Sequence, residues 1–282
     1  MNELFHAFAT NPPLQSALLS GVLASIASGV IGTYVVVRRI TYIAGGIAHC
    51  VLGGLGAAYY FQVEWGWTWC DPMLGAIAAA LAAALIIGYV SLRAKEREDT
   101  VIGALWAIGM AVGVLFIAAT RGYAPDLPSL LFGNILMVSR ADLWMTAGLD
   151  LLIVGCGLLL FNRFQAVCFD EEFSRLRGLR VEFYYLLLLC LTALTVVVLM
   201  KVVGVVMVIA LLTLPVAVAG AFAHRLSHMM LLACVLGTIL TAGGLALSYL
   251  TDMPAGATII ALSGAAYLAT AGLQIVRRRS RQ

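Results

Sequence analysis

A single histidine lies within a long run of glycine, alanine and large apolar residues. The run is YIAGGIAHCVLGGLGAAYY, from Tyr42 to Tyr60, and His49 stands near its middle. Neutral imidazole is a common ligand of zinc, manganese and iron, and a histidine on a smooth helix face can sit at a helix crossing rather than against lipid. Small residues flank His49 at helical spacing: Gly45, Gly46, Gly53 and Gly54. The pattern therefore indicates either a transient metal site or a histidine that is hydrogen-bonded to a neighbouring helix for packing alone.

Three other ionisable residues are weaker candidates for metal chemistry. Asp150, in TAGLDLLIVGC, falls inside another apolar run, where it is either a pathway group or lies nearer the membrane interface. His224 and His228 are four residues apart and would share a helix face, but no third ligand accompanies them in a basic segment. For this pair, contact with solvent or with a partner protein is the better interpretation. The six cysteines have no CxxC or metal-finger spacing and are expected to act as small packing residues.

Sequence motifs for nucleotide or hydrolytic chemistry are absent. There is no GxxxxGK[ST] phosphate loop, and Lys95 and Lys201 are the only lysines in the chain. GxSxG, HExxH and paired intramembrane carboxylates are missing as well. We therefore expect neither an enzyme nor a permanently bound cofactor, and nothing in the sequence indicates nucleic-acid binding.

The elements that must position these residues are membrane-spanning helices. The chain has 282 residues, of which 62% are hydrophobic and only 11% are charged, whereas soluble domains carry about a quarter charged residues. A bilayer core about 30 Å thick needs roughly 20 apolar residues per helix. Apolar stretches of that length predict one all-α domain over residues 1–282, a polytopic transmembrane bundle embedded in the lipid bilayer, with about nine spans, or eight if one pair merges. The predicted spans are 14–37, 41–62, 72–92, 100–119, 142–161, 182–200, 203–222, 229–250 and 256–276.

The distribution of basic residues predicts the orientation, because loops rich in lysine and arginine stay in the cytoplasm. With the amino terminus outside, fourteen of the seventeen basic residues fall in cytoplasmic segments, which leaves Arg121, Arg140 and Lys201 on the outer side. Nine spans then place the carboxyl terminus, VRRRSRQ, in the cytoplasm.

Two outer segments are candidates for the entrance of a pathway. Residues 127–139 are too short to cross a bilayer and too apolar for a solvated loop, so they predict a re-entrant or interfacial helix, with Asp126 as its N-cap. Asp252, in LTDMPAGATI, precedes the last predicted span, where it either caps a helix or adds negative charge to the entrance.

Two cytoplasmic segments are candidates for docking surfaces. Glu98 and Asp99 have the features of a capped helix start. The segment FDEEFSRLRGL combines the apolar residues Phe169, Phe173 and Leu176, spaced i, i+4 and i+7, with the acidic residues Asp170, Glu171 and Glu172. This spacing predicts a short amphipathic helix that ends at Gly178. We expect it to pack against a partner, because about eight residues are unstable as an isolated helix.

Taken together, these segments resemble the membrane-spanning subunits of bacterial ABC-type importers for zinc, manganese and related divalent metals. The matching stretches run in order along nearly the whole chain: VVVRRITYIAGGIAHCVLGG, REDTVIGALW, RGYAPDLPSLLFGNIL, FDEEFSRLRGL, KVVGVVMVIALLTLPVAVAG and TDMPAGATI. The resemblance implies a multi-pass permease of the bacterial cytoplasmic (inner) membrane that works as two copies. It further implies two cytoplasmic ATPase subunits that bind ATP and an extracytoplasmic metal-binding protein that delivers the ion. The stretch from Phe169 to Gly178 would be a coupling helix that presses on the ATPase, with Glu98 and Asp99 assisting.

The resemblance also sharpens the question about His49. This residue matches the histidine of the family's second-helix motif, in which an aspartate four residues earlier shares the helix face as a second metal ligand. Here Gly45 stands at the aspartate's position, so this helix supplies one oxygen ligand fewer, and Asp150 is a weak candidate for the missing ligand. Fewer hard oxygen ligands favour zinc slightly over manganese. We therefore expect an ATP-driven importer of a divalent transition metal, zinc favoured over manganese or iron, that works by alternating access in a homodimer.

Three other functions are open at this point. The same architecture would suit a permease for an iron chelate or a corrinoid, which needs a wider cavity. An ion-coupled secondary metal carrier would carry ionisable residues on several spans rather than on two. A structural or assembly protein would have no pathway at all.

Overall fold

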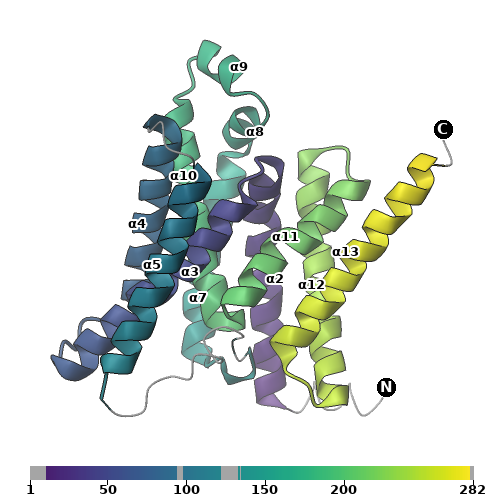
Figure 1. The fold of residues 1–282 in the computed structure, drawn as a ribbon. Helices are drawn as coiled ribbons and strands as arrows, with labels where there is room; N and C mark the ends of the chain where they lie inside the picture. The colour runs from purple at the N-terminus through teal and green to yellow at the C-terminus, as the bar shows by residue number, and fades with distance from the viewer. Residues whose placement is uncertain (1–10, 94–97, 122–132, 134, 280–282) are drawn as a thin grey trace.

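The computed structural model describes residues 11–93, 98–121, 133 and 135–279, and these residues form an all-α bundle without strands (Figure 1). The helices, with η1 as a single 3-10 turn, are α2 (Pro12–Val37), α3 (Thr41–Glu64), α4 (Pro72–Arg93), α5 (Glu98–Ala119), η1 (Ile135–Met137), α7 (Arg140–Leu159), α8 (Phe161–Phe169), α9 (Glu171–Leu176), α10 (Val181–Val203), α11 (Val205–Phe222), α12 (Leu226–Thr251) and α13 (Ala255–Arg279). The predicted fold class is confirmed.

Nine of the described helices are long and apolar enough to cross a bilayer: α2, α3, α4, α5, α7, α10, α11, α12 and α13. They coincide with the nine predicted spans to within three residues at each end. The closest pair, α10 and α11, is separated only by Gly204, whose φ of 79° is a conformation that breaks a helix and favours glycine. The described part of the chain therefore shows nine spans rather than eight.

The predicted outer helix over residues 127–139 falls mostly outside the described residues, as does its N-cap Asp126. The described portion is the 3-10 turn η1, which packs on α2 through the buried side chain of Ile135. Ser139 then starts α7 with a capping box: its hydroxyl accepts from the backbone N–H of Asp142, and the Asp142 carboxylate accepts from the Ser139 backbone.

Two helices organise the bundle. α2 packs against α7, α10, α11 and α12, while α3 packs against α4 and α5. The contacts of α3 are backbone to backbone: a Cβ on Gly53 would lie 2.8 Å from the carbonyl oxygen of Gly109 in α5, and one on Gly56 would lie 2.6 Å from that of Gly113. Gly53, one of the small residues predicted to allow a close helix approach, therefore lies at the crossing of α3 and α5.

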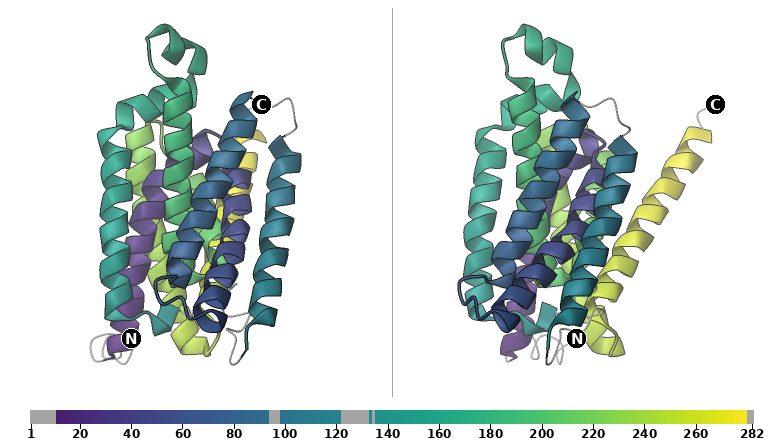
Figure 2. Two further views of the ribbon diagram at one scale, coloured as in Figure 1. Left: turned by 90° about the vertical axis from the view of Figure 1, so that its left-hand side faces the viewer. Right: turned by 60° about the vertical axis from the view of Figure 1, so that its left-hand side comes forward.

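The helices differ strongly in how much of their apolar surface is covered. The most apolar stretches of α2 and α10 are 72% buried, whereas those of α5 and α7 are 22% buried and that of α13 is 17% buried. α13 packs on α11 and α12 and leans outward from the bundle toward its carboxyl end (Figure 2). Such open apolar faces suit contact with lipid or with a partner subunit.

One end of the bundle carries an additional structure. α9 projects beyond the long helices, α8 lies at the same end, and α13 also ends there, opposite the start of α2 (Figure 1). The start of α2 and the end of α13 thus lie at opposite ends of the bundle, which agrees with an odd number of crossings. We call the end with α9 the inner end, following the predicted orientation, and the opposite end the outer end.

Candidate metal site and coupling segment

His49 lies in the third turn of α3, about 12 Å along the helix from its inner end at a rise of 1.5 Å per residue. Its side chain is 8% exposed, and Nδ1 is fully buried with no hydrogen-bond partner among the described residues. Leaving a buried polar atom unpaired costs about 1–3 kcal/mol, so such an atom needs an explanation. Packing alone would have predicted a hydrogen bond from a neighbouring helix, and Nδ1 makes none within the described part of the chain.

The imidazole ring of His49 stacks on Trp106 of α5. The ring centroids are 4.1 Å apart and the planes are inclined by only 11°. Tyr42, two turns earlier on α3, also approaches Trp106, with its ring centroid 6.3 Å away. Because the indole covers one face of the imidazole, it restrains the ring plane and leaves the two nitrogens at the edge, where a metal would bind. Trp106 was not among the residues predicted from sequence, although a tryptophan inside a span rather than at a membrane interface is a recognisable signal.

Gly45 lies on the same face of α3 as His49, as their spacing predicts. A Cβ built on Gly45 would be 3.7 Å from Cδ1 of Ile209 and 3.9 Å from Cζ3 of Trp106, which are ordinary contact distances. Beside Gly45 lies a cavity of about 510 Å³, which Trp106, Thr213 and Tyr267 also line. The position that lacks the carboxylate therefore has room for one, because within the described part of the chain only Ile209 and Trp106 come within 4 Å of that Cβ.

The other predicted packing glycines have much closer neighbours than Gly45. A Cβ on Gly46 would lie 2.6 Å from Cγ2 of Ile102, and a Cβ on Gly54 would collide with the carbonyl oxygen of Gly75 in α4. These positions exclude larger side chains because another helix occupies the space, whereas Gly45 faces the cavity.

Asp150 lies in α7 with 4% of its side chain exposed, and neither carboxylate oxygen has a hydrogen-bond partner among the described residues. Its helix, α7, packs mainly on α2 and α10. The helix that carries His49, α3, packs mainly on α4 and α5. Within the described chain no group of three or more histidine, cysteine or acidic side chains is arranged to hold a metal ion. The metal candidates His49 and Asp150 thus lie on helices whose main packing partners differ.

The prediction of one coupling helix from Phe169 to Gly178 is wrong at its start. Phe169 is the last residue of α8, and the extended backbone of Asp170, with φ −152° and ψ 102°, separates it from α9. The carboxylate of Asp170 accepts from the backbone N–H of Phe173, so Asp170 is the N-cap of a new helix rather than a residue within one. The helix ends at Leu176, and Gly178 follows in a left-handed conformation with φ 76°.

The apolar residues of this segment still point away from the chain. Phe169 is 65% exposed, Phe173 is 49% exposed and Leu176 is 87% exposed. Three large apolar groups at the projecting inner end form a surface that the chain itself leaves uncovered. The residue before this surface, Cys168, is buried: burial raises the pKa of its thiol to about 11, against the opposing charge of Arg38, so the thiol stays protonated.

Two more acidic candidates lie at the start of α5. The helix begins at Glu98, and Asp99 is exposed at the same end of the bundle as α9. The side chain of Glu98 lies outside the described part of the structure.

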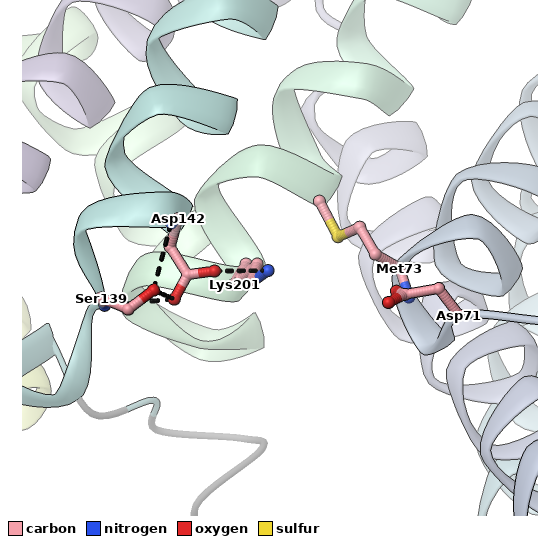
Figure 3. A network of polar contacts seen from close by, with 5 residues as sticks. All are labelled: Asp71, Met73, Ser139, Asp142 and Lys201. Atoms are coloured by element: carbon pink, nitrogen blue, oxygen red, sulfur yellow. Dashed lines mark hydrogen bonds and ion pairs between the residues drawn. The ribbon is translucent and has the colours of Figure 1, made fainter. Parts of the chain in front are cut away.

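The outer end combines polar contacts with a second cavity. Asp142 pairs with Lys201 at 2.7 Å, which ties the start of α7 to the end of α10, and Asp71 accepts from the backbone N–H of Met73 at the start of α4 (Figure 3). Asp252 is exposed in a left-handed turn after α12, with φ 56°, and lines a cavity of about 460 Å³. The entrance candidate Asp252 is therefore accessible from the outer end.

His224 and His228 are exposed, but the prediction that they share a helix face is wrong, because His224 lies in the connection between α11 and α12 and His228 lies in the first turn of α12. His224 and His228 both line a cavity of about 640 Å³ at the inner end, together with Arg225. No third ligand joins them among the described residues. The six cysteines, all of them described, form no disulfide.

Comparisons with known proteins show which protein family this chain resembles. The model of the ABC 3 transport family matches residues 11–274. A Chlamydia trachomatis protein named "Probable metal transport system membrane protein" is 42% identical over 95% of this chain and 90% of its own length. The manganese transport system membrane protein MntC of Halalkalibacterium halodurans is 34% identical over 88% of this chain and 82% of its own.

A solved structure supports the same assignment. The chain is similar to a chain of PsaBC from Streptococcus pneumoniae, solved in complex with Fab, with a TM-score of 0.85 and 29% sequence identity. The match covers 95% of this chain and 94% of the other.

Proposed function

The chain belongs to the ABC 3 transport family, the membrane-spanning permeases of ABC-type metal importers, and from this premise we propose that it forms the translocation path for one divalent transition metal. Membership makes the chain a multi-pass transport protein rather than an enzyme. Hydrolysis of ATP belongs to separate partner subunits.

One observation carries the proposed path: within a span, His49 has a buried Nδ1 without a hydrogen-bond partner among the described residues, and its ring stacks on Trp106, which lines a cavity. Ionisable residues inside spans are expensive and usually face a pathway or a partner. The stacked indole of Trp106 holds the imidazole in one plane, which lowers the cost of ordering the ligand when a metal arrives. His49 is therefore the proposed metal ligand, and Asp150 is a weaker candidate.

The donor set favours zinc. Gly45 adds no carboxylate, and no group of three or more histidine, cysteine or acidic side chains placed to hold a metal ion lies among the described residues, so the proposed ligand from each subunit is the imidazole of His49. Imidazole suits zinc, whereas manganese prefers carboxylate, carbonyl and water ligands. Manganese is the second candidate because relatives such as MntC are named for its transport, and iron is the third.

The proposed assembly follows the family. Two copies of the chain form the path, two cytoplasmic ATPase subunits contact the exposed apolar residues of the segment from Phe169 to Leu176, and an extracytoplasmic metal-binding protein docks at the outer end near Asp252. Closure of the ATPase subunits on ATP then exposes His49 to the two sides in turn. The location is the cytoplasmic membrane of a bacterium, with the amino terminus outside and the carboxyl terminus inside.

Reconstitution tests this proposal. The chain is placed in liposomes with its ATPase and delivering protein, and ATP-dependent uptake of zinc, manganese and iron is measured under competition. We expect ATP-dependent uptake with zinc the preferred ion. Uptake by the chain alone under a proton or sodium gradient would indicate a secondary carrier, and uptake of an iron chelate or a corrinoid but not of the bare ions would indicate the wider-cavity permeases.

A further inference from the structure

Arg38 lies where four helices meet at the inner end. Its guanidinium forms an ion pair with Glu171, the first residue of α9, and Nη1 donates to the carbonyl oxygen of Val167 in α8 at 3.4 Å. Its Cζ lies 5.3 Å from the centroid of the Tyr185 ring in α10. The Tyr185 hydroxyl is 3.1 Å from the hydroxyl of Ser91 in α4. A single side chain at the end of α2 thus joins α8, α9 and α10.

The turn that follows Arg38 is short and well fixed. Arg39 adopts a left-handed conformation with φ 62°, and its N–H donates to the carbonyl of Val36 at 3.1 Å. The N–H of Ile40 donates to the carbonyl of Val35 at 2.9 Å, which completes a Schellman motif, and the Ile40 side chain is buried. Because only this turn separates the helices, α3 starts directly from the point that Arg38 holds.

α3 connects that point to the metal candidate. His49 is nine residues after Ile40, which is about 13 Å along a helix that behaves as a rigid element. Its stacking partner Trp106 lies on a different helix, α5. A shift of the start of α3 therefore changes the position of His49 relative to Trp106 and to the cavity beside Gly45.

We propose that Arg38 is a positioning residue that transmits movement of α9 to α3 and so couples ATP hydrolysis in the partner subunits to the His49 site. The inference rests on the proposed function, in which α9 contacts the ATPase. Within the described chain, Arg38–Glu171 is the ion pair that connects α9 to the spans. Its side chains are 22% and 36% exposed, and partly exposed pairs contribute little to stability, so its loss disturbs coupling more than folding.

A double-mutant cycle tests the proposal in the complete complex. Arg38→Gln, Glu171→Gln and the double variant are reconstituted with the ATPase and the delivering protein, and zinc and manganese uptake is measured together with ATP hydrolysis. Each single variant is expected to assemble and to transport about threefold less metal per ATP. The double variant is expected to transport no less metal per ATP than the more impaired single variant, because all three variants remove the same ion pair. Arg39→Gln, which removes the adjacent exposed charge, serves as the matched control. It is expected to transport as much metal per ATP as the unchanged chain.

Each contrary outcome has one meaning. Unchanged metal transport per ATP in both single variants would overturn the proposal, as would losses that multiply in the double variant. Failure of the single variants to co-purify with the ATPase would also overturn it, because the ion pair would then serve assembly rather than transmission. No ATP-dependent uptake by the unchanged complex would instead contradict the proposed function, so the two failures are distinguishable.

Discussion

The imidazole of His49 and the indole of Trp106 lie face to face, with centroids 4.1 Å apart and planes inclined by 11°. The stack joins α3 to α5 beside the cavity that Gly45 lines. Where the family's motif has a carboxylate one turn before the histidine, this chain has open space next to an aromatic ring. The proposed site therefore depends on imidazole nitrogen, and Trp106 determines how that imidazole is presented.

Removal of the indole tests the role of the stack. We expect Trp106→Ala to reduce ATP-dependent metal uptake several-fold, because the imidazole loses an aromatic contact worth about 0.5–1.5 kcal/mol and the restraint on its plane. Trp106→Phe keeps a ring and should retain most of the uptake. Trp144, which is 80% exposed on α7, supplies the control Trp144→Ala. Equal uptake by the Ala variants at both positions would show that the stack is irrelevant to transport.

Restoring the missing carboxylate tests the explanation of metal preference. The space at Gly45 accommodates a side chain at ordinary contact distances, so Gly45→Asp should fold and should raise manganese uptake relative to zinc uptake. Gly45→Ala fills part of the same space without an oxygen and is the matched control. The explanation fails if the manganese-to-zinc ratio is the same for the two variants.

Close packing of α3 on α4 predicts a stability difference between two glycines. In Gly54→Ala the new methyl group would collide with the backbone of Gly75 and lie 2.5 Å from Cβ of Ala79, which costs about 1–3 kcal/mol. A Cβ on Gly103 of α5 meets nothing within 4 Å, so Gly103→Ala should leave the stability unchanged or raise it slightly. Thermal unfolding of the purified permease compares the two variants. Equal melting temperatures would contradict the observed packing.

The buried carboxylate of Asp150 predicts a gain from neutralisation. Asp150→Asn should raise the melting temperature of the permease, because both oxygens are buried without a partner among the described residues and an amide is less costly to bury than a charged carboxylate. A lower melting temperature would indicate a partner that stabilises the carboxylate. Metal uptake by the same variant addresses the weaker ligand candidate: loss of uptake with a stable fold would place Asp150 in the metal path.

The spans could be predicted from sequence because hydropathy is a local property. Nine apolar stretches of sufficient length gave nine helices, and the glycines around His49 correctly indicated a close helix approach. Trp106 could not be paired with His49 in this way, since helical periodicity relates residues within one helix and says nothing of which residue a second helix presents. The departure at Gly45 was visible in the sequence, but the cavity beside it depends on α11 and α13.

The segment from Phe169 to Gly178 shows a different limit of prediction from sequence. An i, i+4, i+7 pattern from Phe169 to Leu176 predicted one helix, yet Asp170 interrupts it. The side chain of Asp170 accepts a hydrogen bond from the backbone N–H of Phe173, three residues later. The free energy gained from this cap exceeds what a continuous helix of so few residues would gain. The sequence contained the signal for the break, since aspartate is a preferred N-cap.

The most direct test of the central claim is ATP-dependent zinc and manganese uptake by the reconstituted complex that carries His49→Ala, with His228→Ala as the control at an exposed histidine. If His49 is the metal ligand of the path, its variant assembles with the ATPase and loses at least about tenfold of the uptake, while His228→Ala transports normally. Full uptake of both ions by an assembled His49→Ala complex would contradict the account.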